Sequence, residues 1–166
     1  TLIVVTADHE TGGIALGTGK YALNLKALEN QKASAEVLSK KISDLRKAKN
    51  NHVAWEDIKN LLSEEMGFWS VLPITWEQEK KLRDEYEKSF VRNKVEFAES
   101  MYAKTEPMAA KAKEVMDQIA MVGWTSGGHS AGYVPVFAIG AGSDLFIGKM
   151  DNTEIPKRIA KAGGYK

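Results

Sequence analysis

The chain of 166 residues has the length of one ordinary domain, and its 23 basic and 22 acidic residues leave a net charge of +1. This balance provides no basic surface for nucleic acid, and no run of about 18 apolar residues predicts a transmembrane helix. We therefore expect no nucleic-acid partner and no membrane span. The chain has no cysteine, so any bound metal must use oxygen and imidazole ligands.

The first segment of the chain predicts a strand with polar residues at its end. Residues 1–7 form a short apolar run rich in β-branched side chains, which predicts a fully buried strand. Asp8, His9 and Glu10 follow it, and a turn is expected at 11–13. Ligand sites of open α/β sheets lie outside the carboxyl ends of strands. Because whole proteins seldom begin inside a core strand, we expect the chain to be a fragment of a longer protein.

The middle of the chain, residues 20–122, is rich in charged residues and predicts helices. Four apolar stripes at helical spacing comprise Ala35, Leu38, Ile42 and Leu45; Trp55, Ile58, Leu61 and Leu62; Leu82, Tyr86, Phe90, Phe97 and Met101; and Met108, Ala112, Val115 and Ile119. The third helix is expected to begin at Thr75, at capping-box spacing from Gln78, and the fourth to hold Pro107 in its first turn. We interpret the stripes as packing between helices. The apolar linker 67–73 is expected to pack under them or to form a partner surface.

The last part of the chain returns to alternating strand and helix. The expected elements are a polar, glycine-rich loop at 124–130, a strand at 133–139, a turn at 140–142, and a final helix that Asp151 and Glu154 open and that 163–164 stop.

Two of the three histidines are candidate metal ligands. His9 and His129 lie in glycine-flanked loops on either side of the helical segment, whereas His52 precedes a helix and is expected to have a surface or capping role. At the end of a strand, Asp8 and His9 can converge on one cation, and carboxylate oxygen with imidazole nitrogen suits zinc. The spacing equally allows a hydrogen-bonded Asp–His pair without a metal.

The loop around His129 offers a second kind of chemistry. Glycines at 127–128 let the backbone bring a side chain close to a ligand. Ser126 and Ser130 are candidate nucleophiles with His129 as a nearby base, but neither lies in a Gly-x-Ser-x-Gly elbow. A serine hydrolase is therefore the weaker interpretation.

Three segments, in the same order along the chain, resemble segments of alkaline phosphatases. Residues 6–13, Thr-Ala-Asp-His-Glu-Thr-Gly-Gly, are similar to the late metal-binding motif of bacterial members. Residues 124–136, Trp-Thr-Ser-Gly-Gly-His-Ser-Ala-Gly-Tyr-Val-Pro-Val, resemble the C-terminal segment of the family. Residues 146–153, Phe-Ile-Gly-Lys-Met-Asp-Asn-Thr, are similar to the stretch before its last helix. The helical middle does not align.

The resemblance implies a metal-dependent phosphatase. In that family, two zinc ions and one magnesium ion surround a nucleophilic serine, and phosphate monoesters are hydrolysed through a phosphoserine intermediate. By position, Asp8 and His9 resemble ligands of the zinc that activates the serine. His129 resembles a ligand of the other zinc, which holds the leaving-group oxygen. Glu10 and Thr11 would support these ligands without binding the metal.

The catalytic serine, the phosphate-clamping arginine, the magnesium ligands and the remaining zinc ligands of the family have no recognisable match in the chain. We therefore expect no catalytic residue here, and an inactive fragment whose N-terminal half supplies them. The resemblance also implies a homodimer and a periplasmic or extracellular location. Its rivals are a phosphodiesterase or sulfatase relative of the same superfamily and a non-catalytic helical binding module.

The fold implied by the resemblance is α/β: a portion of a largely parallel sheet flanked by helices. Residues 1–19 would supply a core strand and the first ligand loop, and residues 123–166 the second ligand loop, a strand and the final helix. Residues 20–122 would form a helical insertion that acts as a cap or a dimer element.

Overall fold

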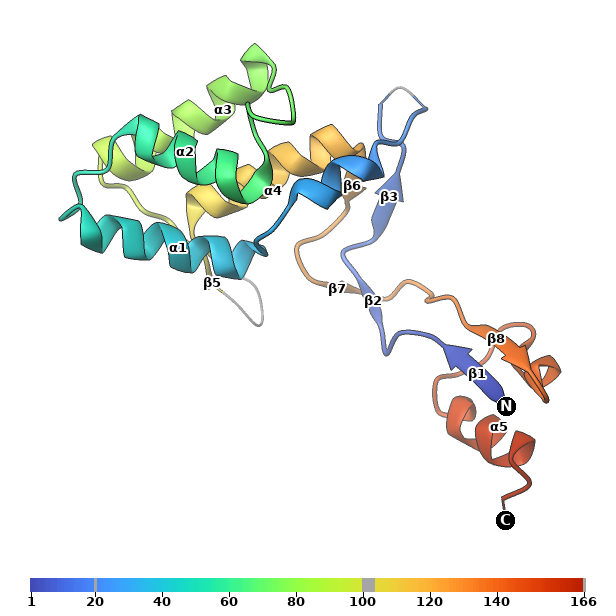
Figure 1. Cartoon of the computed structure of the whole chain (residues 1–166). Coiled ribbons are helices and arrows are strands. Elements are labelled where there is room, and N and C mark those ends of the chain that lie inside the picture. Colours follow the sequence, from blue (N-terminus) through green and yellow to red (C-terminus); the bar gives the residue numbers. More distant parts are fainter. Residues whose placement is uncertain (20, 100–103, 166) are drawn as a thin grey trace. The chain divides into compact units, whose positions relative to one another are not determined.

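The computed structural model describes residues 1–19, 21–99 and 104–165 and divides the chain into two compact units. The terminal unit combines residues 1–13 with residues 126–166, and the helical unit comprises residues 14–125. Figure 1 shows both units, and together they mix helices with short strand pairs.

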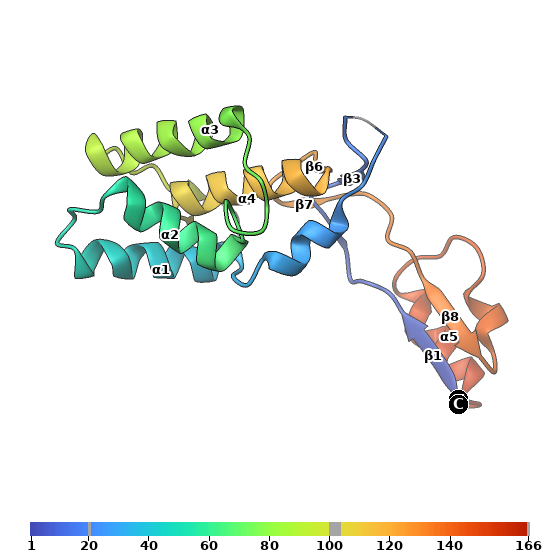
Figure 2. The same cartoon turned by 45° about the horizontal axis from the view of Figure 1, so that its top comes forward.

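The helical unit is built around one central helix. Its elements are β3 (Ile14–Leu16), η1 (Leu25–Asn30), α1 (Ala35–Ala48), α2 (Trp55–Met66), α3 (Trp76–Tyr86), η2 (Glu87–Val91), β4 (Ala98–Glu99), β5 (Lys104–Thr105), α4 (Pro107–Ala120) and β6 (Val122–Trp124). Helix α4 contacts α1, α2 and α3, as the view in Figure 2 also shows. Strands β3 and β6 pair antiparallel, as do β4 and β5.

The predicted apolar stripes form the core of this unit, which confirms the interpretation as helix packing. Side chains with at most 1% exposure come from α1, α2, α3 and α4: Leu38, Ile42, Ile58, Leu62, Leu82, Met108, Ala112 and Val115. Burying each large one contributes about 1.5–3 kcal/mol. None of the helices described here combines the length and apolar character needed to cross a membrane.

Helix α3 begins as predicted but ends earlier than the stripe suggests. The Thr75 hydroxyl accepts a hydrogen bond from the Gln78 amide at 3.3 Å, and the Gln78 side chain accepts one from the Thr75 amide at 3.0 Å. The helix continues through the π-helical turn η2, and Asn93 then adopts a left-handed conformation with φ 53°. Phe97 is consequently 47% exposed, so its predicted place in the stripe is wrong. Met101 lies outside the described residues.

The linker 67–73 packs against the helices, which is the first of the two roles predicted for it. Gly67 ends α2 in a left-handed conformation with φ 71°. This turn directs Phe68 and Leu72 into the core, where they are 0% and 8% exposed, while Val71 remains 67% exposed. The linker is therefore part of the hydrophobic core.

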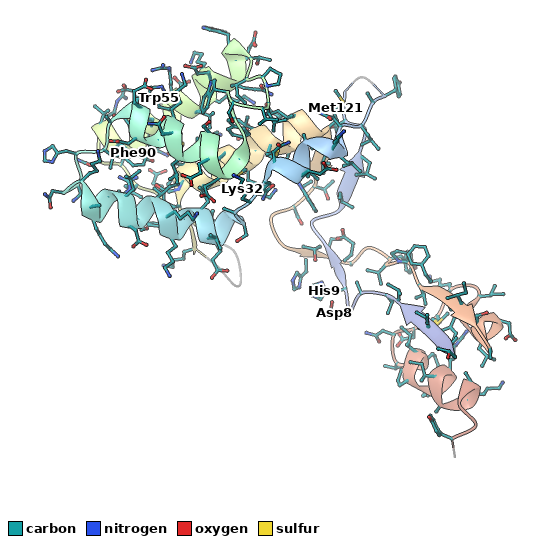
Figure 3. All side chains as sticks on the ribbon, viewed as in Figure 1. Asp8, His9, Lys32, Trp55, Phe90 and Met121 are labelled. Carbon is teal, nitrogen blue, oxygen red and sulfur yellow. The ribbon has the colours of Figure 1, made fainter. Side chains whose placement is uncertain are left out.

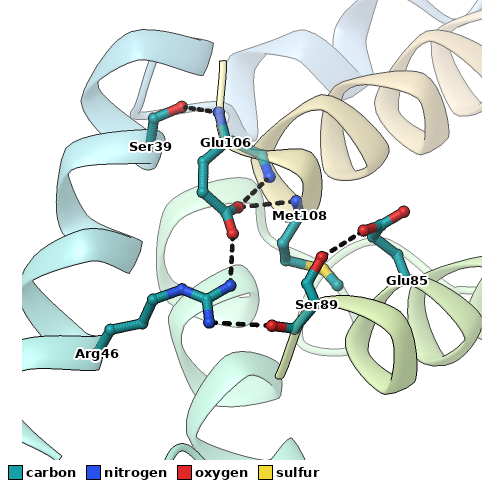
Figure 4. A network of polar contacts seen from close by, with 7 residues as sticks. Ser39, Arg46, Glu85, Ser89, Glu106 and Met108 are labelled. Atoms are coloured by element: carbon teal, nitrogen blue, oxygen red, sulfur yellow. Dashed lines mark hydrogen bonds and ion pairs between the residues drawn. The ribbon is translucent and has the colours of Figure 1, made fainter. Parts of the chain in front are cut away.

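A buried ion pair connects α1 to the start of α4 (Figure 4). Glu106 precedes α4, and its carboxylate accepts hydrogen bonds from the Met108 amide at 2.7 Å and the Ala109 amide at 3.2 Å. The same carboxylate accepts one from the Arg46 guanidinium at 2.8 Å. Arg46 also donates to the Ser89 carbonyl at 3.2 Å. The sequence patterns gave no sign of this network.

In the terminal unit, residues 1–13 and 126–165 form two antiparallel strand pairs and one α-helix. Its elements are β1 (Leu2–Val5), β2 (Glu10–Thr11), β7 (His129–Ser130), β8 (Phe137–Gly140), η3 (Ser143–Phe146) and α5 (Glu154–Ala162). Strand β1 pairs with β8, and β2 pairs with β7. Within the described residues every pairing between named strands is antiparallel, so the expected parallel sheet is not seen.

Two strand predictions for the terminal unit need correction. The strand expected at 133–139 begins only at Phe137, because Pro135 has no amide hydrogen to donate to a strand pair. The strand at the start of the chain is not fully buried: Ile3 and Val5 are 54% and 58% exposed. A strand buried on both faces needs cover on both, and among the residues that the structure describes β1 pairs with β8 alone.

Candidate metal-ligand site

The β2–β7 pair brings together two segments that the helical unit separates in sequence. In its register Glu10 lies opposite Ser130, and Thr11 lies opposite His129. The Gly12 amide donates to the Gly128 carbonyl at 2.8 Å, which extends the pairing beyond the two strands. His9 therefore immediately precedes one strand, and His129 opens the strand beside it.

The two histidine rings are in contact. Their centroids lie 3.6 Å apart with the ring planes tilted by 31°. Asp8 is next to His9 on the segment between β1 and β2, where Figure 3 labels both residues. The three candidate ligands, Asp8, His9 and His129, thus lie close together in the terminal unit.

The geometry of Asp8 and His9 suits two ligands of one tetrahedral ion. The His9 Nε2 atom lies 3.5 Å from the Asp8 Oδ2 atom. Carboxylate and imidazole ligands lie about 2.0–2.2 Å from a tetrahedral zinc, which places two of them about 3.3–3.6 Å apart. The other carboxylate oxygen, Oδ1, accepts a hydrogen bond from the His9 amide at 3.1 Å, which orients Oδ2.

The surroundings of His9 select the nitrogen that a metal would use. Its Nδ1 atom lies 3.0 Å from the Glu10 carbonyl oxygen. Because a carbonyl only accepts hydrogen bonds, Nδ1 carries the proton in the neutral ring, and Nε2 keeps its lone pair. Hydrogen bonds of this kind orient metal-binding histidines in proteins.

The donor set fits a metal only in part. Across residues 1–19, 21–99 and 104–165, no three histidine, aspartate or glutamate side chains converge on one point. Asp8 and His9 would supply two ligands, and the rest would have to come from elsewhere. The Asp8 side chain is 88% exposed, so its carboxylate remains hydrated and available to a cation.

The two serines near His129 use their hydroxyl protons elsewhere. The Ser126 hydroxyl donates to the Gly128 carbonyl at 3.0 Å. The Ser130 hydroxyl donates to the Glu10 carboxylate. Because a hydroxyl has a single proton to donate, neither serine donates a hydrogen bond to His129. The interpretation as a serine hydrolase therefore receives no support from the structure.

A cavity of about 240 Å³ adjoins two of the candidate ligands, and Asp8, His9 and Tyr133 are among the residues that line it. The Lys149 ammonium lies 4.4 Å from the centre of the Tyr133 ring, a cation–π contact. Sequence reasoning missed this contact, because neither residue lies in a polar cluster or at ligand spacing.

Asp151 stabilises the start of the last helix, α5. The Asp151 carboxylate accepts hydrogen bonds from the Thr153 amide at 2.9 Å and from the Thr153 hydroxyl at 2.7 Å. These bonds hold the pKa of Asp151 below its ordinary value of 3.8. Helix α5 itself begins at Glu154, and Thr153 before it makes no side-chain capping hydrogen bond. The side chain that accepts from the backbone at the start of the helix is that of Asp151, as the sequence predicted.

His52 belongs to the helical unit, whereas the candidate ligands belong to the terminal unit. It is exposed in the helical unit, and its Nδ1 atom lies 2.9 Å from the Asn50 carbonyl oxygen. This agrees with the surface role expected for it and makes His52 a suitable control position.

Comparison with known proteins points to one family. The family model described as alkaline phosphatase matches residues 1–165. Alkaline phosphatase 3 of Bacillus subtilis (strain 168) is 31% identical over an alignment of 176 residues that covers 99% of this chain and 30% of that relative. Alkaline phosphatase 4 of the same organism is 26% identical over 162 residues, which is 97% of this chain and 29% of that relative.

A solved structure supports the same assignment at the level of fold. A cold-active alkaline phosphatase from the psychrophile Shewanella sp. aligns with a TM-score of 0.62 and 24% identity, over 96% of this chain and 33% of that one. The chain spans about 30% of the length of the curated relatives it matches. The chain belongs to the alkaline phosphatase family.

Proposed function

We propose that the full-length enzyme containing this chain hydrolyses phosphate monoesters with zinc, and that Asp8, His9 and His129 are zinc ligands. The observation that carries the proposal is the geometry of the three side chains. Asp8 Oδ2 and His9 Nε2 lie 3.5 Å apart, and the His129 ring contacts the His9 ring. Asp8 and His9 would bind the zinc that activates the nucleophile, and His129 the zinc on the leaving-group side.

The remaining chemistry would come from the part of the enzyme that this chain does not span. Each catalytic zinc needs about three protein ligands, and this chain supplies two candidates for one ion and one for the other. We infer that a serine nucleophile, a phosphate-binding arginine, the other zinc ligands and the magnesium ligands are supplied from there. Phosphoryl transfer to the serine, followed by hydrolysis of the phosphoserine, splits one difficult step into two easier ones.

The role of the bound zinc would be to polarise the phosphate ester and to lower the pKa of water. The residues of this chain would orient it. The Glu10 carbonyl fixes the tautomer of His9, and the Asp8 carboxylate supplies negative charge beside the imidazole. The cavity lined by Asp8, His9 and Tyr133 would then receive part of the ester.

The wider context of the enzyme is proposed from the family. We infer that β1 joins a largely parallel sheet in the full-length enzyme, and that residues 20–122 act there as a cap or a dimer element. A homodimer and a periplasmic or extracellular location complete the proposal. This chain by itself would be an inactive fragment.

The test is the hydrolysis of p-nitrophenyl phosphate by the full-length enzyme. We expect turnover that is lost on metal removal, restored by zinc and abolished by His129→Ala, while the control His52→Ala keeps it. Preferential hydrolysis of a phosphodiester or a sulfate ester would favour a related metallohydrolase. Absence of any zinc-dependent turnover would reject the proposal in favour of a binding module. Turnover by the 166-residue chain alone would refute its dependence on the rest of the enzyme.

A further inference from the structure

A hydrogen-bonded cluster joins the two candidate ligand segments through their side chains. One carboxylate oxygen of Glu10 accepts a hydrogen bond from the Gly13 amide at 2.7 Å. The other accepts one from the Ser130 hydroxyl, although Glu10 and Ser130 are 120 residues apart in sequence. The Ser130 oxygen in turn accepts a hydrogen bond from the Gly132 amide at 3.2 Å.

The cluster is closely packed around Gly132. A β-carbon at this position would lie 3.1 Å from the Glu10 Cγ atom and 3.3 Å from the Ser130 Oγ atom. These distances are shorter than ordinary contacts, so the backbone approaches both side chains in a way that a larger residue would disturb. Glu10 and Ser130 are therefore held from several directions.

The position of the cluster connects it to the ligands. Glu10 directly follows His9, Ser130 directly follows His129, and the β2–β7 register places Glu10 opposite Ser130. Strands of two residues contribute little stability by themselves, since even an isolated hairpin is marginal in water. A side-chain hydrogen bond between the strands would therefore do much to keep the His9 and His129 ring centroids 3.6 Å apart.

We propose that Glu10 and Ser130 are positioning residues: their hydrogen bond holds the segment bearing Asp8 and His9 against the segment bearing His129. The inference rests on the proposed function, because it takes these side chains as zinc ligands. Loss of contacts that orient metal ligands typically weakens metal binding by about 10–100-fold. We expect Ser130→Ala to lower zinc affinity by about 10-fold or more.

Conservative and control variants separate positioning from general disruption. Ser130→Thr keeps a hydroxyl at the same place in a strand and should restore most of the affinity. Glu10→Gln retains one acceptor oxygen for two donors, so its loss should be smaller than that of Glu10→Ala. Ser126→Ala is the matched control, because the Ser126 hydroxyl donates within its own loop, to the Gly128 carbonyl.

The experiment measures zinc affinity of the metal-stripped full-length enzyme by competition with a chromophoric chelator. The visible spectrum of the cobalt-loaded enzyme reports ligand geometry, and the unfolding temperature of the metal-free enzyme shows whether each variant is folded. Weaker zinc binding and an altered cobalt spectrum in Ser130→Ala, with recovery in Ser130→Thr, would support the positioning role of the hydrogen bond. Wild-type affinity in Ser130→Ala, or an equal loss in Ser126→Ala, would overturn it.

The two proposals fail in different ways. If the unaltered full-length enzyme binds no zinc, the proposed function fails and the positioning role fails with it. If the unaltered enzyme binds zinc and Ser130→Ala binds it equally well, only the positioning role is overturned.

Discussion

Removing the carboxylate of Glu106 should strongly destabilise the helical unit. The Glu106 side chain is 1% exposed and pairs with the Arg46 guanidinium at 2.8 Å, which is itself only 14% exposed. Glu106→Ala would leave the Arg46 charge without its partner and would remove the acceptor for the Met108 and Ala109 amides at the start of α4. Both losses act on the same helix junction.

The size of the effect follows from these contacts. Breaking a buried ion pair by removing one partner costs about 3–5 kcal/mol, and loss of a helix cap costs about 0.5–2 kcal/mol. Arg46 keeps its hydrogen bond to the Ser89 carbonyl and lies 3.6 Å from the centre of the Phe90 ring. Because these contacts partly compensate, we expect Glu106→Ala to cost about 3 kcal/mol, near the lower limit for a broken buried pair.

Urea unfolding of the chain, followed by tryptophan fluorescence, measures this change. Asp84→Ala is the control, because its pair with Lys80 is exposed and contributes less than about 0.5 kcal/mol. Replacing both members of the buried pair, in Arg46→Met/Glu106→Ala, should cost much less than the sum of the single changes. A loss below about 1 kcal/mol for Glu106→Ala, comparable with that of an exposed pair, would refute the reasoning.

Three further predictions concern α2 and α3. Leu62 is completely buried, so Leu62→Ala should cost about 2–5 kcal/mol in urea unfolding; a change near zero would contradict the described core. Gly67 has φ 71°, and an added β-carbon would lie 2.8 Å from the Asn30 Cβ atom. Gly67→Ala should therefore lower the free energy of unfolding by more than about 1 kcal/mol; equal stability would argue against this turn. The Arg83 guanidinium lowers the pKa of Glu79 below its ordinary value of 4.5. Its contribution to stability is complete above pH 4.5 and is lost as the pH falls through the lowered pKa. Glu79→Gln should reduce the acid dependence of the urea midpoint, and an unchanged dependence would contradict this assignment.

The helices could be predicted from the sequence because their signals are local. The stripe through Leu38 and Ile42 and the capping box at Thr75 depend on residues three or four positions apart, and both are found in the structure. The overextension of the third stripe to Phe97 had a local cause as well. Apolar spacing cannot show that Asn93 turns the backbone into the left-handed region and ends the helix.

Contacts between distant segments could not be predicted in the same way. The antiparallel pairing of β2 with β7 joins residues separated by the whole helical unit, and nothing in the local pattern specifies it. Family resemblance named Asp8, His9 and His129 individually, while the contact between the two rings emerges only in three dimensions. Ser130 was considered for its hydroxyl chemistry, but its partner, Glu10, lies 120 residues away.

The exposed face of β1 shows why its burial was misjudged. A short apolar strand predicts cover on both faces, because such runs are typical of sheets enclosed by helices. In this chain Ile3 and Val5 remain more than half exposed. The sequence pattern indicates that β1 is suited to burial on both faces, and the described residues cover those faces only in part.

Calorimetric titration of zinc into the metal-stripped full-length enzyme tests the central claim most directly. If Asp8, His9 and His129 are zinc ligands, the unaltered enzyme binds zinc, and His129→Ala binds with lower affinity or reduced stoichiometry, while His52→Ala is unchanged. Zinc binding that is identical in the unaltered enzyme and in His129→Ala would contradict the assignment of His129 as a ligand.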